Sequence, residues 1–515
     1  MELISIIPGF KPKNDDRLLA KAEALKPRLV YTSQPNPVSC GINQEPISFE
    51  ALSERPLRRG DQVFLDFGRH LVGRLTLTLD QTGSHQDAPA FVQVDLAEIA
   101  QELDERPEEY SGWLSRSWIQ REQLHMDELP SRLTLPRRYA FRYVRLTVLD
   151  TSPKYQLLLK EASCTAESAA DWSAVKVPEL QDDTLRRVYA ASLRTLADCS
   201  QQVLEDGPKR DRRLWLGDLR LQALTSYVSF KNYALVKRCL YLFAGTRFPD
   251  GRMSANVFTD GHPAADDTYL LDYALMALPA LNEYLEETGD QEALADLLEP
   301  VLEQADYVLA NYLTPERVLA PSCGELGFID WCDGLDRQAA LQGVLICALE
   351  DAASLCRSAG NQERRARYRE LAVELRQAAV RQFWSDEKGC FVSGGQVSVH
   401  SQVWLTLAGA VTGKAAEAAL EAAMKESGDQ LRMGSPYMHH YYVMALLKAG
   451  SREKAEAHLR GYWGGMLEAG ADTFWECWDP EHPLSSPYGG IIVNSFCHAW
   501  SCTPAYIIHR FLSHS

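Results

Sequence analysis

The spacing of apolar residues changes along the chain and divides it into two parts. Up to about residue 165, apolar and polar positions alternate in short runs, the period-two pattern of half-buried strands. The runs lie at 63–68, 73–80, 91–96, 133–135 and 142–149. Turn-forming residues separate them, which predicts a β-sandwich over residues 1–165 that mainly supports the rest of the protein. Residues 101–125 are polar, and we expect a long loop there.

After a linker at residues 166–180, apolar residues recur at the three- and four-residue spacing of helices. Twelve segments have this pattern: 183–200, 218–230, 231–243, 266–288, 291–313, 336–359, 361–383, 399–409, 414–426, 436–449, 452–467 and 491–513. Twelve helices in pairs would suit an (α/α)6 barrel of six inner and six outer helices over residues 181–515. An irregular helical bundle is the alternative arrangement.

Composition narrows the range of partners. The chain has 515 residues and a formal net charge of −17, which argues against a nucleic-acid or anionic-membrane partner. No run approaches twenty apolar residues, so we expect no membrane span. Twelve cysteines are scattered without a CxxC pair, the pattern of reduced thiols in a cytoplasmic protein. No HExxH motif occurs, and we expect neither a metal nor a cofactor; the oligomeric state stays open.

One acidic stretch stands out at the start of the helical part. Asp206, Asp211 and Asp218 are five and seven residues apart, with arginines, a lysine and a tryptophan between them. Gly207 and Pro208 predict a turn, and Asp218 precedes an apolar run, so it can begin a helix. A loop that gathers carboxylates can keep one ionised and another protonated, as acid/base hydrolysis requires. A surface salt-bridge network is the alternative reading.

Several later segments combine aromatic and acidic residues. Asp330 and Trp331 are adjacent, the stretch 475–478 reads Trp-Glu-Cys-Trp, and His498 follows Asn-Ser-Phe-Cys. Aromatic faces stack on the apolar face of a sugar ring, while carboxylates and histidine bond its hydroxyls. Each tryptophan taken alone is better explained by core packing, and a lone histidine by a satisfied buried position. Together the segments favour a sugar site.

These motifs resemble those of the bacterial α-L-rhamnosidases. The stretch 206–218 is similar to the family's Asp-Cys-Pro-x-Arg-[Asp/Glu] signature followed by Gly-Trp-x-Gly-Asp. Three further matches follow in the family's order: 328–331 (Gly-Asp-Trp), 473–478 (Thr-x-Trp-Glu-Arg-Trp) and 494–498 (Asn-Ser-Phe-Asn-His). Upstream, 66–73, 97–98 and 141–144 resemble the β-domain that precedes the family's barrel. The resemblance spans about residues 60–513.

The resemblance implies an (α/α)6 catalytic barrel that hydrolyses a glycosidic bond with inversion. It makes Asp211 the general acid and Glu476 the general base that activates water. An inverting pair stands about 6.5–9.5 Å apart, so its members can come from distant loops. The residues expected to bind the carbohydrate are Asp206, Arg210, Trp215, Asp218, Asp330, Trp331, Trp475, Trp478 and His498.

Two departures from the family pattern keep alternatives open. Gly207 stands where the family usually has cysteine, and Cys477 replaces the arginine of Trp-Glu-Arg-Trp. An inverting glycosidase for a uronic acid or another deoxy sugar would account for them. Arg212 and Arg213 directly follow Asp211, which motivates a third hypothesis, a non-catalytic sugar-binding relative. The linkage and the aglycone are not predicted.

Overall fold

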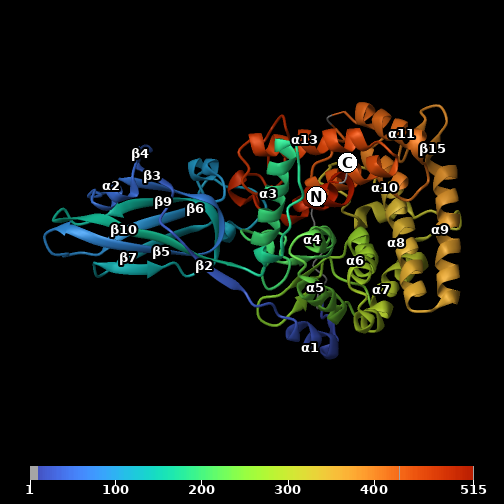
Figure 1. Cartoon of the computed structure of the whole chain (residues 1–515), viewed down its shortest axis with the longest axis horizontal. Helices are drawn as coiled ribbons and strands as arrows, with labels where there is room; N and C mark the ends of the chain where they lie inside the picture. Colours follow the sequence, from blue (N-terminus) through green and yellow to red (C-terminus); the bar gives the residue numbers. More distant parts are fainter. Residues whose placement is uncertain (1–9, 429, 514–515) are drawn as a thin grey trace.

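The computed structural model describes residues 10–428 and 430–513 and has a sheet-rich part and a helical part side by side along its long axis (Figure 1). The sheet-rich part contains β2 (Val30–Gln34), β3 (Ser39–Ile42), β4 (Glu45–Ile47), β5 (Gln62–Gly83), β6 (Ala90–Ala97), β7 (Arg121–Met126), β8 (Ser131–Thr134), β9 (Tyr139–Asp150) and β10 (Tyr155–Ser168). Their main order is β2-β10-β5-β9-β6-β7, and every pairing is antiparallel. Alternate side chains of these strands form one apolar core.

Strand β5 runs the length of this sheet. It joins the two strands expected at 63–68 and 73–80, and its pairing with β9 shifts register between Asp66 and Leu71. The segment expected as a long loop, 101–125, contains the 3-10 helices Ala100–Asp104 and Arg116–Trp118 and the start of β7. Strands β2, β3, β4 and β10 were not among the expected strands; β10 carries only partial alternation, and the other three are short.

The helical part follows the predicted spacing closely. Its helices are α3 (Asp183–Cys199), α4 (Leu216–Val228), α5 (Tyr233–Gly245), α6 (Leu271–Thr288), α7 (Gln291–Tyr312), α8 (Gln338–Ser358), α9 (Gln362–Phe383), α10 (Val399–Leu407), α11 (Gly413–Glu426), α12 (Pro436–Lys448) and α13 (Arg452–Glu468). Helices α4, α6, α8, α10 and α12 contact one another in turn, and the 3-10 helix Ala499–Cys502 contacts both α12 and α4. These segments therefore form a closed inner ring.

The single helix expected at 491–513 is wrong. The chain instead forms the 3-10 helices Ile491–Val493 and Ala499–Cys502, a short α14 (Pro504–Ile507) and a π-helical turn, Ile508–Leu512. Pro504 lacks the N–H that would continue a helix through it. Residues 494–498 form hydrogen bonds with other loops, described below, instead of helical ones. Their side chains can therefore contribute to a site.

Two further placements qualify the sequence expectations. Residues 13–24, expected with the sheet, lie on the helical part, where β1 (Lys13–Asn14) pairs with β12 (Thr246–Arg247) and α1 (Asp16–Ala24) packs on α5. Among the described residues, α8 alone is long and apolar enough to pass a length-and-composition test for a membrane span. Of its most apolar window, 78% is buried in the protein, as its position in the inner ring requires.

Candidate active site

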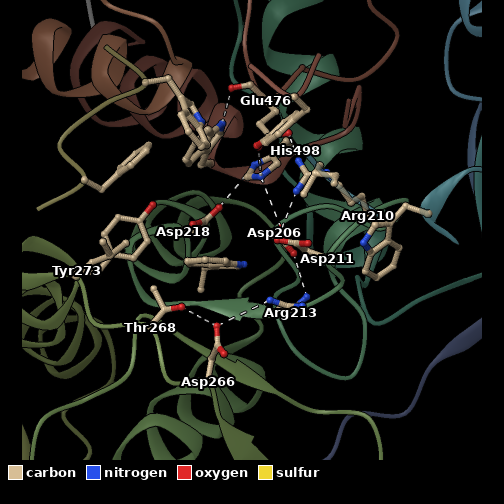
Figure 2. Close-up of a pocket in the computed structure, with 18 of the residues that line it drawn as sticks. Asp206, Arg210, Asp211, Arg213, Asp218, Asp266, Thr268, Tyr273, Glu476 and His498 are labelled. Carbon is tan, nitrogen blue, oxygen red and sulfur yellow. Dashed lines mark hydrogen bonds and ion pairs between the residues drawn. The ribbon is translucent and has the colours of Figure 1, made fainter. Parts of the chain in front are cut away.

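A cavity of about 250 Å³ collects residues from both parts of the chain. Its lining consists of Trp113, Leu114, Trp118, Asp206, Arg210, Asp211, Arg213, Trp215, Asp218, Asp266, Thr268, Leu270, Tyr273, Phe328, Trp331, Glu476, Tyr488, His498 and Trp500. Most of the candidate residues are therefore brought together, with the acidic stretch on one side and the later segments opposite (Figure 2). A cavity of this size suits one small ligand.

The acidic stretch enters the cavity as a tight turn. Two hydrogen bonds between Asp206 and Arg213 close this turn. The Asp206 N–H donates to the Arg213 carbonyl oxygen at 3.0 Å, and the Arg213 N–H donates to the side-chain Oδ1 of Asp206 at 3.0 Å. Asp211 and Arg212 have φ values of 65° and 53°. Such values are uncommon outside glycine and cluster at functional sites, where they cost about 1–3 kcal/mol each. The turn thus places Asp211 on the cavity wall.

Asp206 and Asp218 are the buried carboxyls of this stretch. Asp218 lies in the first turn of α4, as its place before an apolar run predicted. Burial raises the pKa of Asp206 well above its usual range, and the neighbouring Asp211 and Asp218 carboxyls raise it further. Burial likewise raises the pKa of Asp218, with Glu476 adding to the shift. Both groups therefore favour the protonated form, which can donate or accept a hydrogen bond.

Glu476 is held by two strong donors. Arg210 Nη2 forms an ion pair with Glu476 Oε2, and the Tyr488 hydroxyl donates to Glu476 Oε1. The other guanidinium nitrogen, Arg210 Nη1, lies 3.4 Å from Asp211 Oδ2. Charge-assisted bonds of this kind stabilise a carboxylate in its ionised form. One arginine therefore faces both Asp211 and Glu476.

His498 lies between the carboxyl groups without touching any of them closely. Its Nδ1 is 3.6 Å from Asp218 Oδ1, and its Nε2 is 3.9 Å from Asp206 Oδ2 and 4.0 Å from Glu476 Oε1. These separations exceed ordinary hydrogen bonds of about 2.7–3.2 Å. Burial lowers the pKa of His498 well below its usual range, and Arg210 lowers it further. The ring is neutral and has one donor and one acceptor nitrogen available for a ligand.

The two arginines that follow Asp211 point elsewhere. Arg212 Nη2 donates to the Arg138 carbonyl oxygen of the sheet-rich part at 2.9 Å. Arg213 Nη1 lies 4.0 Å from Asp266 Oδ2. Neither guanidinium pairs with Asp211 among the residues that the structure describes; the arginine that faces Asp211 is Arg210.

Aromatic rings form the apolar walls of the cavity. Trp215 and Tyr273 meet edge to face at 6.2 Å, and Phe328 stacks on Trp500 at 6.0 Å. The indole Nε1 atoms of Trp215 and Trp331 are buried and have no hydrogen-bond partner within residues 10–428 and 430–513. The same holds there for Asp218 Oδ1 and His498 Nδ1. Apolar faces beside unpartnered polar atoms are what a hydroxylated ring requires.

Asp330 does not line the cavity, contrary to what the sequence led us to expect. It accepts hydrogen bonds from the Gly434 and Trp331 N–H groups and the Ser435 hydroxyl, and it lies 2.9 Å from His400 Nε2. These partners use its acceptor capacity. Asp330 therefore anchors the loop that presents Trp331.

Trp475 and Trp478 are likewise outside this cavity's lining. The Trp475 ring meets Phe496 edge to face at 5.0 Å in the core. Trp478 packs against Tyr462 at 5.2 Å and borders a neighbouring cavity of about 490 Å³ that shares Trp331. Both side chains therefore pack in the core, as the alternative interpretation of single tryptophans expected, and they lie outside the cavity that Glu476 lines.

Sequence reasoning missed several lining residues. Tyr273, Tyr488 and Asp266 lie in segments without any of the motifs described above. Trp113 and Trp118 come from the part of the chain that we expected to be supporting only. Trp113 keeps 52% of its surface exposed, so it lies at the rim. Only the contact between the two parts of the protein identifies Trp113 and Trp118 as lining residues.

Two groups of side chains among the described residues are close enough to share a cation. They are His70, Asp198 and Cys497, and Asp479, Glu481 and His482. Neither group lines the cavity. In the first, both ring nitrogens of His70 face carboxylates, with Nδ1 2.7 Å from Asp198 and Nε2 3.0 Å from Glu98.

Comparison with known proteins identifies the family of the chain. Residues 31–166 match the glycosyl hydrolase family 78 alpha-rhamnosidase N-terminal domain, and residues 178–512 match the bacterial alpha-L-rhamnosidase 6 hairpin glycosidase domain. A search of curated proteins found no match. A rhamnosidase from Klebsiella oxytoca, solved with rhamnose bound, is 40% identical with a TM-score of 0.93, covering 97% of this chain and 99% of that one.

More distant structures share the fold. The family 78 rhamnosidase of Bacillus sp. GL1 is 22% identical with a TM-score of 0.74 and covers 87% of this chain and 46% of that one. The α-L-rhamnosidase of Streptomyces avermitilis, complexed with L-rhamnose, is 18% identical with a TM-score of 0.67 and covers 94% and 44%. The two-part fold and the acidic cavity define a glycoside hydrolase. The chain belongs to the α-L-rhamnosidases of glycoside hydrolase family 78.

Proposed function

We propose that this protein cleaves terminal α-L-rhamnosides with inversion, with Asp211 as the general acid and Glu476 as the general base. The observation that carries the assignment is that Arg210 faces both carboxyl groups at the wall of one cavity. Asp211 would protonate the glycosidic oxygen as the bond to the anomeric carbon breaks. Glu476 would take a proton from the water that attacks the opposite face.

The remaining polar residues fit the role of sugar ligands. Asp206 and Asp218, with raised pKa values, can donate to hydroxyl oxygens. Neutral His498 can bond a hydroxyl in the gaps of 3.6–4.0 Å that separate it from the carboxyls. Trp215 and Trp331 offer free indole N–H groups and apolar faces. A 6-deoxy sugar, which carries a methyl group, fits a cavity with more apolar than polar wall.

Rhamnose is favoured over a uronic acid because the basic side chains that line the cavity already face carboxylates. Arg210 is committed to Glu476, and Arg213 lies near Asp266, so no free cation stands ready for the carboxylate of a uronic acid among the lining residues that the structure describes. The rhamnose bound in the structure from Klebsiella oxytoca supports the same choice. Oligosaccharides or aglycone conjugates would supply the leaving group beyond the rim at Trp113.

We propose that the sheet-rich part is a β-sandwich folded from one connected nine-stranded sheet, and that the helical part is an (α/α)6 barrel. The closed inner ring of helices, with partner helices outside, is the arrangement that such a barrel requires. We also propose that the protein is cytoplasmic. This location is supported by twelve cysteines that are all free thiols, including Cys199 and Cys497, whose sulfur atoms are 3.8 Å apart.

The test follows the anomeric configuration of the first product. Purified protein is mixed with a nitrophenyl α-L-rhamnoside, and proton NMR is recorded before the released sugar equilibrates. The proposal expects β-L-rhamnose first; α-L-rhamnose as the first product would contradict inversion. A parallel panel of nitrophenyl glycosides, including a glucuronide and a fucoside, tests the sugar. Turnover of another glycoside in preference to the rhamnoside would favour the alternative substrate.

A further inference from the structure

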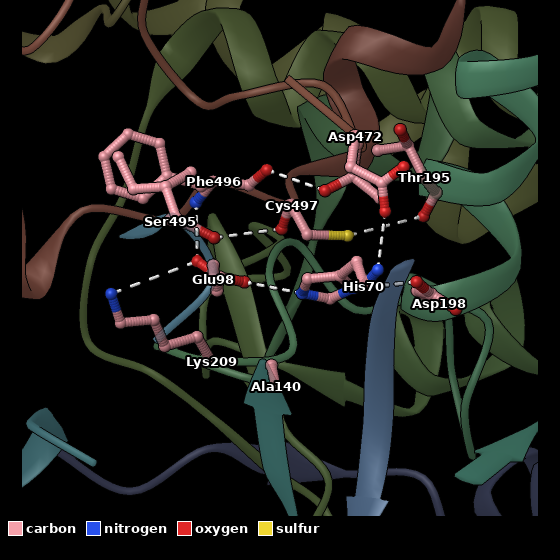
Figure 3. A network of polar contacts seen from close by, with 12 residues as sticks. His70, Glu98, Ala140, Thr195, Asp198, Lys209, Asp472, Ser495, Phe496 and Cys497 are labelled. Atoms are coloured by element: carbon pink, nitrogen blue, oxygen red, sulfur yellow. Dashed lines mark hydrogen bonds and ion pairs between the residues drawn. The ribbon is translucent and has the colours of Figure 1, made fainter. Parts of the chain in front are cut away.

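A buried polar network connects the sheet-rich part to the loops of the active site (Figure 3). Its centre is Glu98, which directly follows β6 and is 4% exposed. Glu98 Oε2 accepts a hydrogen bond from the Phe496 backbone N–H at 2.6 Å, and Glu98 Oε1 lies 3.0 Å from His70 Nε2. A carboxylate of the sheet therefore fixes a backbone position two residues from His498.

The segment that Glu98 holds is bonded in turn to the other site loops. The Glu476 N–H donates to the Ser495 carbonyl at 3.0 Å, and the His498 N–H donates to the Phe474 carbonyl at 2.9 Å. The Ala499 N–H donates to the Asp206 carbonyl at 3.0 Å. Displacing residues 494–498 would thus move the backbones that carry the base, the histidine and the acidic stretch together.

Lys209 makes a second connection between the same parts. Its ammonium group pairs with Glu102, donates to the Asn494 carbonyl at 2.9 Å and lies 4.0 Å from Glu98 Oε2. Glu102 in turn accepts from the Glu98 N–H at 2.9 Å. Lys209 directly precedes Arg210, so the lysine anchors the turn that presents Arg210 and Asp211.

The third connection runs through His70, at the register shift of β5. Its backbone N–H donates to Asp472 Oδ2, at the start of the segment that leads to Glu476. Its ring lies between Glu98 and Asp198. One cluster of the sheet-rich part, formed by His70, Glu98 and Glu102, therefore binds all three segments of the site. These segments are 206–211, 472–476 and 494–498.

We infer that Glu98 is a positioning residue for catalysis, an inference that rests on the hydrolysis proposed above. Through Phe496 and Lys209 it fixes the acid-bearing turn and the His498 segment relative to Glu476. Buried ionic groups of this kind cost desolvation free energy, and one recognised reason for retaining them is a unique arrangement of the chain. Misplacement of catalytic groups by about 1 Å can lower a rate about 100-fold.

The experiment compares three substitutions of Glu98 in the full chain. Glu98→Gln keeps an oxygen that can accept from Phe496, whereas Glu98→Asp keeps the charge but withdraws the oxygen by one methylene, and Glu98→Ala removes both. We expect kcat to fall about 10- to 100-fold in the Asp and Ala variants and at most a few-fold in the Gln variant. KM should change less than kcat, because the aligned proton transfers occur in the transition state.

Asp95→Ala is the matched control for loss of stability. Asp95 lies on β6 three residues before Glu98, is buried, and pairs with Arg121 and Arg145 inside the sheet. We expect it to lower the melting temperature while leaving kcat within about twofold at 25 °C. If Asp95→Ala and Glu98→Ala lowered kcat equally at an equal loss of melting temperature, Glu98 would be merely structural and the inference would be overturned.

Hydrogen exchange gives a readout that does not depend on turnover. The amide of Phe496 should be protected in the wild type and in Glu98→Gln and exchange faster in Glu98→Asp, with β6 still protected. Unchanged protection of residues 494–498 in Glu98→Asp would contradict the inference even if the Ala variant does not fold. A wild type without rhamnosidase turnover would instead count against the proposed function, and the exchange comparison would still decide what Glu98 holds.

Discussion

Asp211 and Glu476 face the same guanidinium, although they belong to loops that are far apart in the chain. Arg210 pairs with Glu476 through Nη2 and lies 3.4 Å from Asp211 through Nη1. The arginine also stacks over the Tyr488 ring at 4.4 Å, and Tyr488 bonds Glu476. This arrangement fixes Glu476, the proposed base, and leaves Asp211, the proposed acid, at the edge of the guanidinium, where it can reach a substrate.

Replacing Arg210 by lysine should show whether the positive charge alone is enough, or whether one guanidinium must contact both Asp211 and Glu476. Arg210→Lys keeps one positive charge but cannot reach both carboxyl groups, because lysine lacks the planar fork. We expect kcat to fall by about 10²–10³-fold, the range seen when one positioned donor is lost. Arg212→Lys is the control, since that side chain faces Arg138, and it should stay within about threefold of wild type. Equal kinetics of the two variants would contradict the bridging role.

Gly207 should resist enlargement. A β-carbon at this position would lie 2.3 Å from Ser495 Oγ and 3.3 Å from the Cys497 carbonyl oxygen, so in Gly207→Ala either the Ser495 side chain or the acidic turn has to shift. We expect about a tenfold loss of kcat. Adding Ser495→Ala removes the closest atom and should restore part of it. Steady-state kinetics of the single and double variants decide this; an Ala variant as fast as wild type would show that the contact is not tight.

The buried carboxyl of Asp218 should cost stability. Because folding raises its pKa, the folded state loses stability as pH rises above the ordinary aspartate value of about 3.9. Asp218→Asn should therefore raise the free energy of unfolding at pH 7–8 by on the order of 1 kcal/mol, and the gain should disappear toward pH 4. Activity should fall at the same time, since Asp218 is a proposed ligand of the sugar.

Asp296→Asn is the control of opposite sign. Although Asp296 is partly buried, Lys21 and Arg17 lower its pKa to about 2. Its charge therefore stabilises the fold above pH 3.9, and this contribution is lost as pH falls toward 2. Thermal unfolding of both variants between pH 2 and pH 8 measures the two effects; the same sign for both at pH 7 would contradict the assignment.

Residues at the rim of the cavity should contribute to binding of the leaving group and not to binding of the rhamnose. Trp118, from the sheet-rich part, lines the cavity alongside Trp113. We expect Trp118→Ala to raise KM several-fold for rhamnosides with large aromatic leaving groups, by loss of about 0.5–1.5 kcal/mol of ring contact. Inhibition by free rhamnose should be unchanged. A comparable loss in rhamnose inhibition would place Trp118 against the sugar instead.

The sequence predicted the elements whose packing is regular. Helices with a 3.6-residue period were found within a few residues, as α7 and α9 illustrate, because burial on one face dictates their apolar spacing. The segment 491–513 has similar apolar content but is broken, since its backbone bonds go to other loops and Pro504 interrupts it. Such partners are distant in the chain and leave no periodic signal.

The site was predictable where chemistry and motif coincided. Asp206, Asp211, Asp218, Glu476 and His498 all reach the cavity. Asp330, Trp475 and Trp478 were equally prominent in the sequence, yet they support the cavity wall from behind. A motif shows which residues belong to the site, but only the packing determines which side of the wall they face.

The roles of Asp211 and Glu476 are tested most directly by changing the leaving group. Turnover of Asp211→Asn and Glu476→Gln is measured on a dinitrophenyl and on an alkyl α-L-rhamnoside. A good leaving group does not need a proton, so Asp211→Asn should keep substantial activity on the dinitrophenyl substrate and lose it on the alkyl one. Glu476→Gln should be slow on both, since water still lacks a base. Near-wild-type turnover of either variant on the alkyl rhamnoside, or the same leaving-group dependence in both, would contradict the account.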